Sequence, residues 1–253
     1  MNQVRVIPIL LLKGKGLYKT INFKNPIYLG DPINAVRIFN EKEVDELVLF
    51  DIDASKNNIG PNFDFIQSIV SESFMPVGYG GGISKIEEIK KLFDLGIEKV
   101  ILNTNSFDYK LLAEAVSIYG SQSIVACIDV KKNFLGGYTV WSKSGMIKHK
   151  LSPIELAVQL TNLGVGELII QSIDFEGKML GLDIELIKLI TKSVNVPVVA
   201  TGGAGKFEDI ILAIEQGGAS AVAAGSIFVF SGKLKAVLIN YLNKDQLNFI
   251  SKI

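Results

Sequence analysis

The chain has 253 residues, and its 26 basic and 26 acidic side chains give a formal net charge of +0. This balance argues against binding to nucleic acid or to a membrane, so any anion must be held locally. No stretch approaches the ~20 uninterrupted apolar residues of a membrane span, and the first residues lack a secretory cleavage site. The one cysteine, Cys127, cannot form an internal disulfide, which is typical of a cytoplasmic protein.

Short apolar segments rich in β-branched residues alternate along the chain with segments of helical period. Their continuous apolar character is typical of strands covered on both faces. In chain order the predicted strands are VRVIPILL (within a buried segment Met1–Leu12), ELVLFDI, PVGYG, KVILN, SIVACIDV, ELIIQSI, VPVVATG and AVAAG. The predicted helices include residues 83–95, 109–119, 152–163, 183–193 and 207–216. We expect left-handed glycines to end helices at Gly96, Gly164 and Gly217.

The sequence repeats itself at an offset of 121 residues. Residues 76–96 (PVGYGGGISKIEEIKKLFDLG) correspond to residues 197–217 (PVVATGGAGKFEDIILAIEQG), and ELVLFDID corresponds to ELIIQSID. Such a long repeat predicts two similar half-structures. Alternating strands and helices also fit a doubly wound open sheet, but two superposable four-strand halves close naturally into a ring. We therefore predict one α/β domain, residues 1–253, folded as a (β/α)8 TIM barrel with halves of about 1–120 and 121–253.

Glycine-rich turns follow several predicted strands, at the end of the barrel where active sites lie. The turns are Gly80–Gly82, Gly202–Gly203 and Ala224–Ser226, and Asn103–Thr104 occupies the repeat position of Ala224–Gly225. Glycine lets backbone N–H groups approach a ligand closely, and the following helix favours an anion. The alternative is that they only form tight turns. Because the pattern occurs twice, we favour two phosphate-binding corners.

Acidic side chains also stand at strand ends. Asp129 ends the strand SIVACID, and a carboxylate emerging from an apolar strand is suited to general acid or base catalysis. A solvated strand-end residue is an equally weighted alternative. The lone His149 is expected in an exposed loop, and no grouping has metal-ligand spacing, so we expect no metal.

Four charged residues stand where strands begin, at the opposite end of the barrel: Arg5, Glu46, Lys99 and Glu167. Two cations and two anions at this end could form a ring of salt bridges. Taken alone, such charges more often indicate a solvated or stabilising face.

Together these segments resemble the HisF family, the cyclase subunit of imidazole glycerol phosphate synthase in histidine biosynthesis. DELVLFDIDAS, YGGGI, EKVILNT, GSQSIVACIDVK, ATGGAGK and AAGSIF follow one another in family order and spacing. The resemblance implies a (β/α)8 barrel, no cofactor and a small-molecule substrate with a phosphate at each end. The substrate-binding positions that it implies or that the strand ends supply are Lys19, Gly82, Asn103, Thr104, Glu176, Gly177, Thr201, Gly202, Gly203, Ala224, Gly225 and Ser226.

The resemblance also implies a protein partner. In this family a HisH-type glutaminase docks on the bottom of the barrel and produces ammonia, which travels through the barrel to the substrate. Arg5, Glu46, Lys99 and Glu167 match the four-charge gate to that passage. Glu98 occupies the position of an acidic residue that faces the glutaminase.

The catalytic end departs from the family pattern. The family uses two strand-end aspartates; Asp129 matches the second, but Leu11 stands where the first belongs. Glu176 replaces an aspartate, whereas Lys19 is retained. Losing one member of an acid–base pair removes a factor of ~100 to 10,000 in rate. This pattern resembles HisF-like paralogues that supply ammonia to a sugar amidotransferase. The orthodox histidine enzyme, a non-catalytic ammonia conduit and a phosphoribosyl isomerase remain alternatives.

Overall fold

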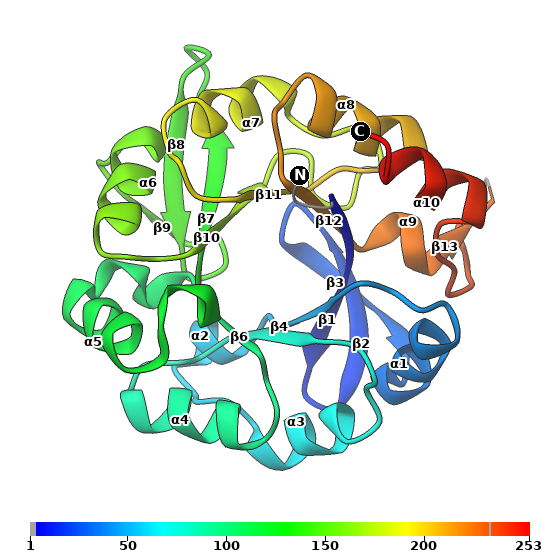
Figure 1. Ribbon diagram of the computed structural model, residues 1–253, viewed down its shortest axis with the longest axis horizontal. Helices are drawn as coiled ribbons and strands as arrows, with labels where there is room; N and C mark the ends of the chain where they lie inside the picture. Colours follow the sequence, from blue (N-terminus) through cyan, green and yellow to red (C-terminus); the bar gives the residue numbers. More distant parts are fainter. Residues whose placement is uncertain (1–3, 233) are drawn as a thin grey trace.

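Eight parallel strands form a closed ring in the computed structural model, which describes residues 4–232 and 234–253 (Figure 1). Pairing of Ile169 with Cys127, between the fifth and sixth strands, closes the ring. This closure confirms the predicted barrel and excludes an open sheet. Residues 1–3 of the predicted first strand lie outside the described residues. The strands of the ring are β1 (Arg5–Lys13), β4 (Leu47–Asp51), β5 (Val77–Gly80), β6 (Lys99–Leu102), β7 (Ile124–Lys132), β10 (Glu167–Ser172), β11 (Val198–Thr201) and β12 (Ala221–Ala224).

Helices surround the ring on its outside (Figure 1). They are α1 (Pro32–Glu41), α3 (Phe63–Val70), α4 (Ile86–Asp94), α5 (Tyr109–Tyr119), α6 (Pro153–Asn162), α7 (Ile184–Thr191), α8 (Phe207–Glu215) and α10 (Lys244–Ile250). Gly96 and Gly164 follow α4 and α6 with φ values of 95° and 93°, as predicted. After α8 the left-handed residue is Gly218, with φ 73°, rather than the predicted Gly217. The chain therefore turns one residue later there. Among the described residues, no helix has the length and apolar character needed to cross a membrane.

Two apolar cores hold the barrel together. The larger core lies between strands and helices, where residues such as Leu10, Leu49 and Leu168 are fully buried. The smaller core fills the inside of the ring with aliphatic side chains and one thiol, and Leu11 and Phe50 pack against its members. Those members are Ile7, Ile9, Val48, Ile101, Val125, Cys127, Ile169, Val199, Ala221 and Ala223. Because strand side chains alternate in direction, the continuous apolar strands supply both cores.

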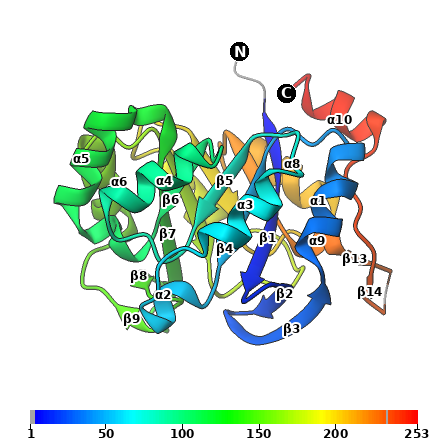
Figure 2. The same cartoon turned by 90° about the horizontal axis from the view of Figure 1, so that it is seen from below.

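Additional elements decorate the carboxyl ends of the strands, and Figure 2 shows two hairpins and α2 gathered at that end. Hairpin β2–β3 follows β1, and hairpin β8–β9 follows β7, which is the repeat partner of β1. The bounds are β2 (Gly16–Ile21), β3 (Lys24–Gly30), β8 (Tyr138–Ser142), β9 (Ile147–Lys148), α2 (Ala54–Asn57), η1 (Thr104–Phe107), α9 (Ser226–Val229), β13 (Phe230–Ser231) and β14 (Ala236–Val237). The short helix η2 (Ser121–Ser123) lies instead directly before β7, at the amino end.

The tips of the two hairpins dock reciprocally on the opposite half of the barrel. Asn22 Nδ2 donates to the Ile173 carbonyl at 2.6 Å, and Ser144 Oγ donates to the Ile52 carbonyl at 3.2 Å. Ile52 and Ile173 are separated by the repeat offset of 121 residues. Both tips contain two consecutive non-glycine residues in the left-handed region, Asn22 with Phe23 and Lys143 with Ser144. The two-fold repeat therefore extends to loops in which the sequence similarity is not visible.

Candidate functional site

A cavity of about 460 Å³ opens at the carboxyl end of the barrel, between the two hairpins and the strand ends. The structure brings all thirteen residues predicted for catalysis or substrate binding around this one cavity. They are Lys19, Gly82, Asn103, Thr104, Asp129, Glu176, Gly177, Thr201, Gly202, Gly203, Ala224, Gly225 and Ser226. The strand-end argument therefore identified one contiguous surface.

Asp129 is buried near the end of β7, where its carboxylate faces the cavity. Burial raises the pKa of Asp129 from its ordinary value near 3.8 to about 7, although hydrogen bonds from Asn103 and Cys127 oppose this rise. The thiol of Cys127 lies 3.8 Å from Asp129 Oδ1. A carboxyl group that titrates near neutral pH is suited to act as acid or base. The thiol is unsuited to nucleophilic chemistry, because burial raises the pKa of Cys127 well above its ordinary range.

Lys19 reaches into the cavity from β2. Its ammonium lies 3.4 Å from the Ile9 carbonyl and packs directly against Gly225, where any Cβ would overlap with Nζ. Burial lowers the pKa of Lys19 from 10.5 to about 8, and the Glu176 carboxylate partly counters this effect. The lysine of one half thus stands at the glycine corner of the other half. An anion at this corner would meet both backbone and a buried cation.

Glu176 holds hairpin β2–β3 against the loop after β10. Its carboxylate accepts a hydrogen bond from Thr20 Oγ1 and another from the Phe23 backbone N–H, both at 3.0 Å. Burial raises the pKa of Glu176, opposed by the Phe23 hydrogen bond and by the Lys19 ammonium. With both oxygens already partnered, Glu176 positions the hairpin that carries Lys19. Its contact with a substrate, expected from sequence, stays a prediction.

The corner of the first half is also partly occupied by protein contacts. Asn103 Nδ2 donates to the Cys127 carbonyl at 2.9 Å, and Thr104 Oγ1 accepts from the Lys143 backbone N–H at 3.1 Å. At Gly203, the glycine of the second corner, φ is 117° and a Cβ would overlap with the Gly181 carbonyl. Glycine is therefore required at Gly203 by the neighbouring backbone as well as by any ligand.

Leu11 occupies the position at which the family resemblance implies an aspartate that would act together with Asp129. Its side chain lines the cavity and packs on the apolar interior of the barrel beside Phe50, its cross-strand neighbour. Asp51, at the end of the neighbouring strand β4, has its Oδ1 bonded to the N–H groups of Asp53 and Ala54, each at 3.0 Å. The apolar wall at Leu11 leaves Asp129 without a carboxylate partner at the position that the resemblance specifies.

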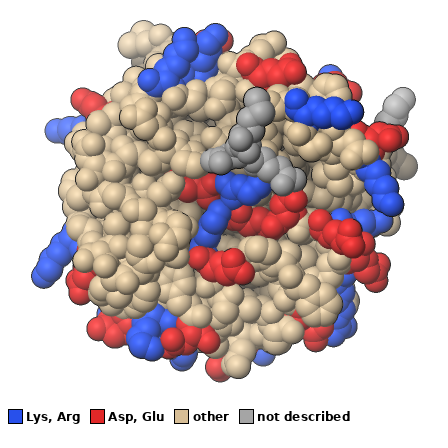
Figure 3. Space-filling model, viewed as in Figure 1, with Lys and Arg blue, Asp and Glu red and all other residues tan. Residues whose placement is uncertain are grey.

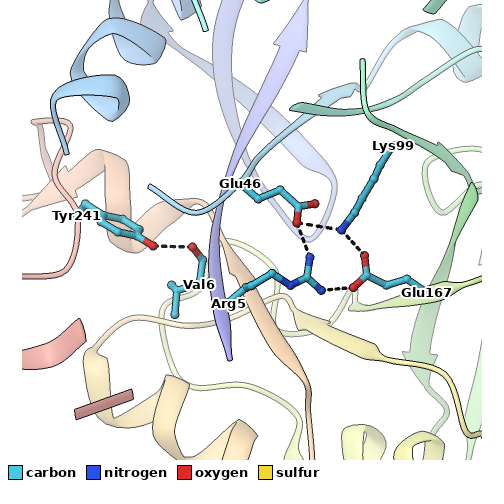
Figure 4. Close-up of polar contacts among 6 residues, drawn as sticks. All are labelled: Arg5, Val6, Glu46, Lys99, Glu167 and Tyr241. Carbon is cyan, nitrogen blue, oxygen red and sulfur yellow. Dashed lines mark hydrogen bonds and ion pairs between the residues drawn. The ribbon is translucent and has the colours of Figure 1, made fainter. Parts of the chain in front are cut away.

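At the other end of the barrel, charged side chains of both signs gather near the centre of the face (Figure 3). Figure 4 shows that four of them form a closed ring of salt bridges. Arg5 pairs with Glu46 through Nη1 and with Glu167 through Nη2. Lys99 Nζ lies 2.9 Å from an oxygen of each glutamate. All four predicted gate residues thus meet in space, and their charges sum to zero.

The ring is partly buried, unlike an ordinary surface salt bridge. The glutamate side chains are 6% and 9% exposed, and those of Arg5 and Lys99 are 26% and 22% exposed. Burial alone would lower the pKa of Arg5, but the two glutamates outweigh it and raise that pKa. Glu98, the predicted partner contact, is exposed next to Lys99 at the same end. The ring forms the floor below the apolar interior, and the cavity lies above it.

Two other observations concern metals and histidine. Across residues 4–232 and 234–253, no three His, Cys, Asp or Glu side chains are arranged to hold a metal ion. His149 is half-buried rather than exposed, so that expectation was wrong. Its ring stacks on Phe107 at 3.8 Å between centroids, and Nε2 lies 2.7 Å from Ser142 Oγ. Phe107 is distant in sequence and Ser142 lies on a hairpin that was not predicted, so neither contact could be expected from the sequence.

Sequence reasoning also missed the roof of the cavity. Asn22, Phe23, Gly145 and Met146 line it from the two hairpin tips. A Cβ on Gly145 would lie 3.3 Å from the Phe23 ring, so the tips approach one another closely. The signal in the sequence for the second hairpin tip was the stretch KSGM, in which serine and glycine separate two segments of strand-like alternation.

The closed barrel, its two-fold repeat and a cavity at the carboxyl strand ends define a (β/α)8-barrel protein with its candidate site in the usual place. A family model described as "Histidine biosynthesis protein" matches residues 5–235. The chain belongs to this family, and its relatives show it to be a HisF-like protein.

Three relatives illustrate the likeness. "Putative imidazole glycerol phosphate synthase subunit hisF2" of Pseudomonas aeruginosa is 51% identical over 245 residues, covering 96% of this chain and 98% of the relative. "Putative imidazole glycerol phosphate synthase subunit hisF3" of Vibrio vulnificus is 44% identical, covering 95% and 94% respectively. "Imidazole glycerol phosphate synthase subunit HisF" of Caulobacter vibrioides is 37% identical, covering 91% and 89%.

Proposed function

We propose that this protein is the synthase subunit of a glutamine amidotransferase complex, which takes ammonia from a HisH-type glutaminase and delivers it to a phosphorylated acceptor. The single observation that carries the proposal is the closed ring of Arg5, Glu46, Lys99 and Glu167 below an apolar interior. Neutral ammonia can cross an apolar interior, whereas a charged ion pays a large desolvation penalty. A charged floor and an apolar interior below the cavity suit such a path.

The proposed acceptor binds at the carboxyl end. Lys19 and the glycine corners would hold its phosphates, and Asp129 would transfer protons during attack by ammonia. The pKa of about 7 for Asp129 allows it to serve as acid or base at neutral pH. Each of these roles uses side chains of this chain alone, without a metal or a cofactor.

We further propose that the acceptor belongs to a sugar amidation pathway rather than to histidine biosynthesis. Leu11 supports this view, because an apolar wall replaces the acid expected opposite Asp129. The orthodox histidine enzyme is the main alternative. A non-catalytic conduit that passes ammonia to a separate sugar amidotransferase is a second candidate, which Leu11 favours and the retained glycine corners disfavour.

The test combines the purified protein, a HisH-type glutaminase, glutamine or ammonium salt, and the aminoimidazole carboxamide precursor of histidine biosynthesis. Stimulation of glutaminase activity without formation of imidazole glycerol phosphate is expected. Product formation at an ordinary enzymatic rate would contradict the sugar pathway. Absence of any glutaminase stimulation would contradict the ammonia-transfer proposal itself. In the Leu11→Asp variant, partial recovery of cyclisation would show that the remaining site is still suited to the histidine precursor.

A further inference from the structure

A second hollow, of about 340 Å³, lies at the rim of the cavity on the side of hairpin β2–β3. It is bordered by the hairpin tip, by the end of β7 and by the loop after β10. Asn22, Lys24 and Lys131 line both the hollow and the main cavity. The hollow and the cavity are therefore direct neighbours, separated by no more than these three side chains.

The charge of this rim hollow is predominantly positive. Lys24, Lys131 and Lys178 contribute ammonium groups, and Asp174 contributes the one carboxylate of its lining. Among the residues that the structure describes, none of these lysines forms a salt bridge within 4.0 Å. Asp174 Oδ2 accepts a hydrogen bond from the Lys132 backbone N–H at 2.7 Å, which occupies part of its capacity. A concave surface with this balance concentrates anions.

The two halves of the barrel differ in how their equivalent strand-end lysines are paired. In the first half, Lys13 follows the strand end two residues after Leu11, and its ammonium pairs with Asp53 at 3.2 Å. Lys131 occupies the same place two residues after Asp129, yet its Nζ lies 5.4 Å from the centre of the Trp141 ring. The equivalent carboxylate, Asp174, is bound to backbone instead. Of these two equivalent lysines at the strand ends, Lys13 is neutralised by a salt bridge and Lys131 is not.

We propose that the rim hollow binds a phosphate-type group of the acceptor, in addition to the groups held by the glycine corners. This inference rests on the proposed function, and it specifies the substrate class: an elongated acceptor with a phosphate or diphosphate beyond the mouth of the barrel. Lysine ammonium groups bind phosphate as point charges, whereas arginine recognises both phosphate and carboxylate through paired hydrogen bonds. The lining of the hollow contains lysines and no arginine.

The test uses the isolated wild-type protein and inorganic pyrophosphate at low ionic strength. Trp141 is the chain's one tryptophan, so its fluorescence reports the surroundings of Lys131. We expect a saturable change with pyrophosphate and a much weaker response to malonate at equal ionic strength. Equal affinity for malonate would overturn the assignment to phosphate.

Lys178 supplies the selective variant, because it lines the hollow but not the main cavity. Lys178→Ala should weaken pyrophosphate binding by about threefold to fivefold, and Lys178→Glu by about tenfold. Lys110→Glu, on exposed α5, carries the same change in net charge and should bind like the wild type. Unchanged affinity in Lys178→Glu, or equal weakening in Lys110→Glu, would refute the proposal. Neither glutaminase nor ammonia enters this assay, so its outcome is independent of the ammonia-transfer test.

Discussion

Lys99→Met tests whether the ring at the bottom of the barrel is a buried network or a solvated set of charges. Lys99 Nζ makes two contacts of 2.9 Å, one to Glu46 and one to Glu167, and both glutamates are almost completely buried. Removing a partner from a buried ion pair costs about 3–5 kcal/mol. Arg5 still contacts both carboxylates, and Lys99 is 22% exposed, so we expect a loss of about 2–3 kcal/mol in unfolding free energy.

Urea unfolding at neutral pH measures this loss directly, and a fall in Tm of about 5–10 °C should accompany it. Lys90→Met is the matched control, because Lys90 pairs with Asp94 on an exposed helix surface and should be replaceable without measurable change. Glu46→Gln completes a double-mutant cycle with Lys99→Met, in which we expect the combined loss to be smaller than the sum of the single losses. If Lys99→Met behaves like Lys90→Met, or if the two ring substitutions are additive, the buried-network interpretation is wrong.

Three further predictions concern the upper end of the barrel. Because burial raises the pKa of Asp129 to about 7, its stabilising contribution is complete below pH ~4, declines as the pH rises towards 7 and is lost above about 7. A shift of one pKa unit corresponds to about 1.4 kcal/mol, so the unfolding free energy of Asp129→Asn relative to the wild type should rise by up to ~4 kcal/mol between pH 4 and 8. Urea unfolding measures this difference, and a difference that does not change with pH would contradict the prediction. Gly225→Ala should displace the Lys19 ammonium and weaken phosphate binding at least tenfold by calorimetry, and unchanged affinity would contradict that placement. Glu176→Ala should release the Phe23 turn and speed amide hydrogen exchange there by about tenfold, with helix α5 as the unaffected reference.

The sequence predicts the barrel well because its evidence is global. Continuous apolar strands, helical periods and the 121-residue repeat all reflect the same closed ring, and closure by β7 and β10 follows from two equal halves. The cavity residues at the strand ends were also predictable, since parallel strands bring their carboxyl ends together whatever the loops do, whereas Lys19 and Gly177 came from the resemblance. Neither inference depended on the conformation of a single loop.

Local features at the site were harder to predict. The left-handed tip at Asn22 and Phe23 contains no glycine, and its contacts lie about 150 residues away, on Ile173 and Glu176. The role of Glu176 as an anchor for this hairpin could not be read from its position after β10. Side-chain partners chosen by tertiary packing leave no local pattern in the sequence.

The reciprocal hairpins change how the two-fold repeat should be understood. Each hairpin covers the strand ends of the other half, and Lys19, supplied by the first half, stands at Gly225 of the second. The two groups whose pKa values burial brings near neutrality, Asp129 and Lys19, both line the cavity, Asp129 at the end of β7 and Lys19 beside Ile9 and Gly225. Leu11, on β1 opposite β7 in the ring, leaves the position that corresponds to Asp129 apolar. Two similar halves thus produce one asymmetric site, with an ionisable carboxyl group at the end of β7 and an aliphatic side chain at the end of β1.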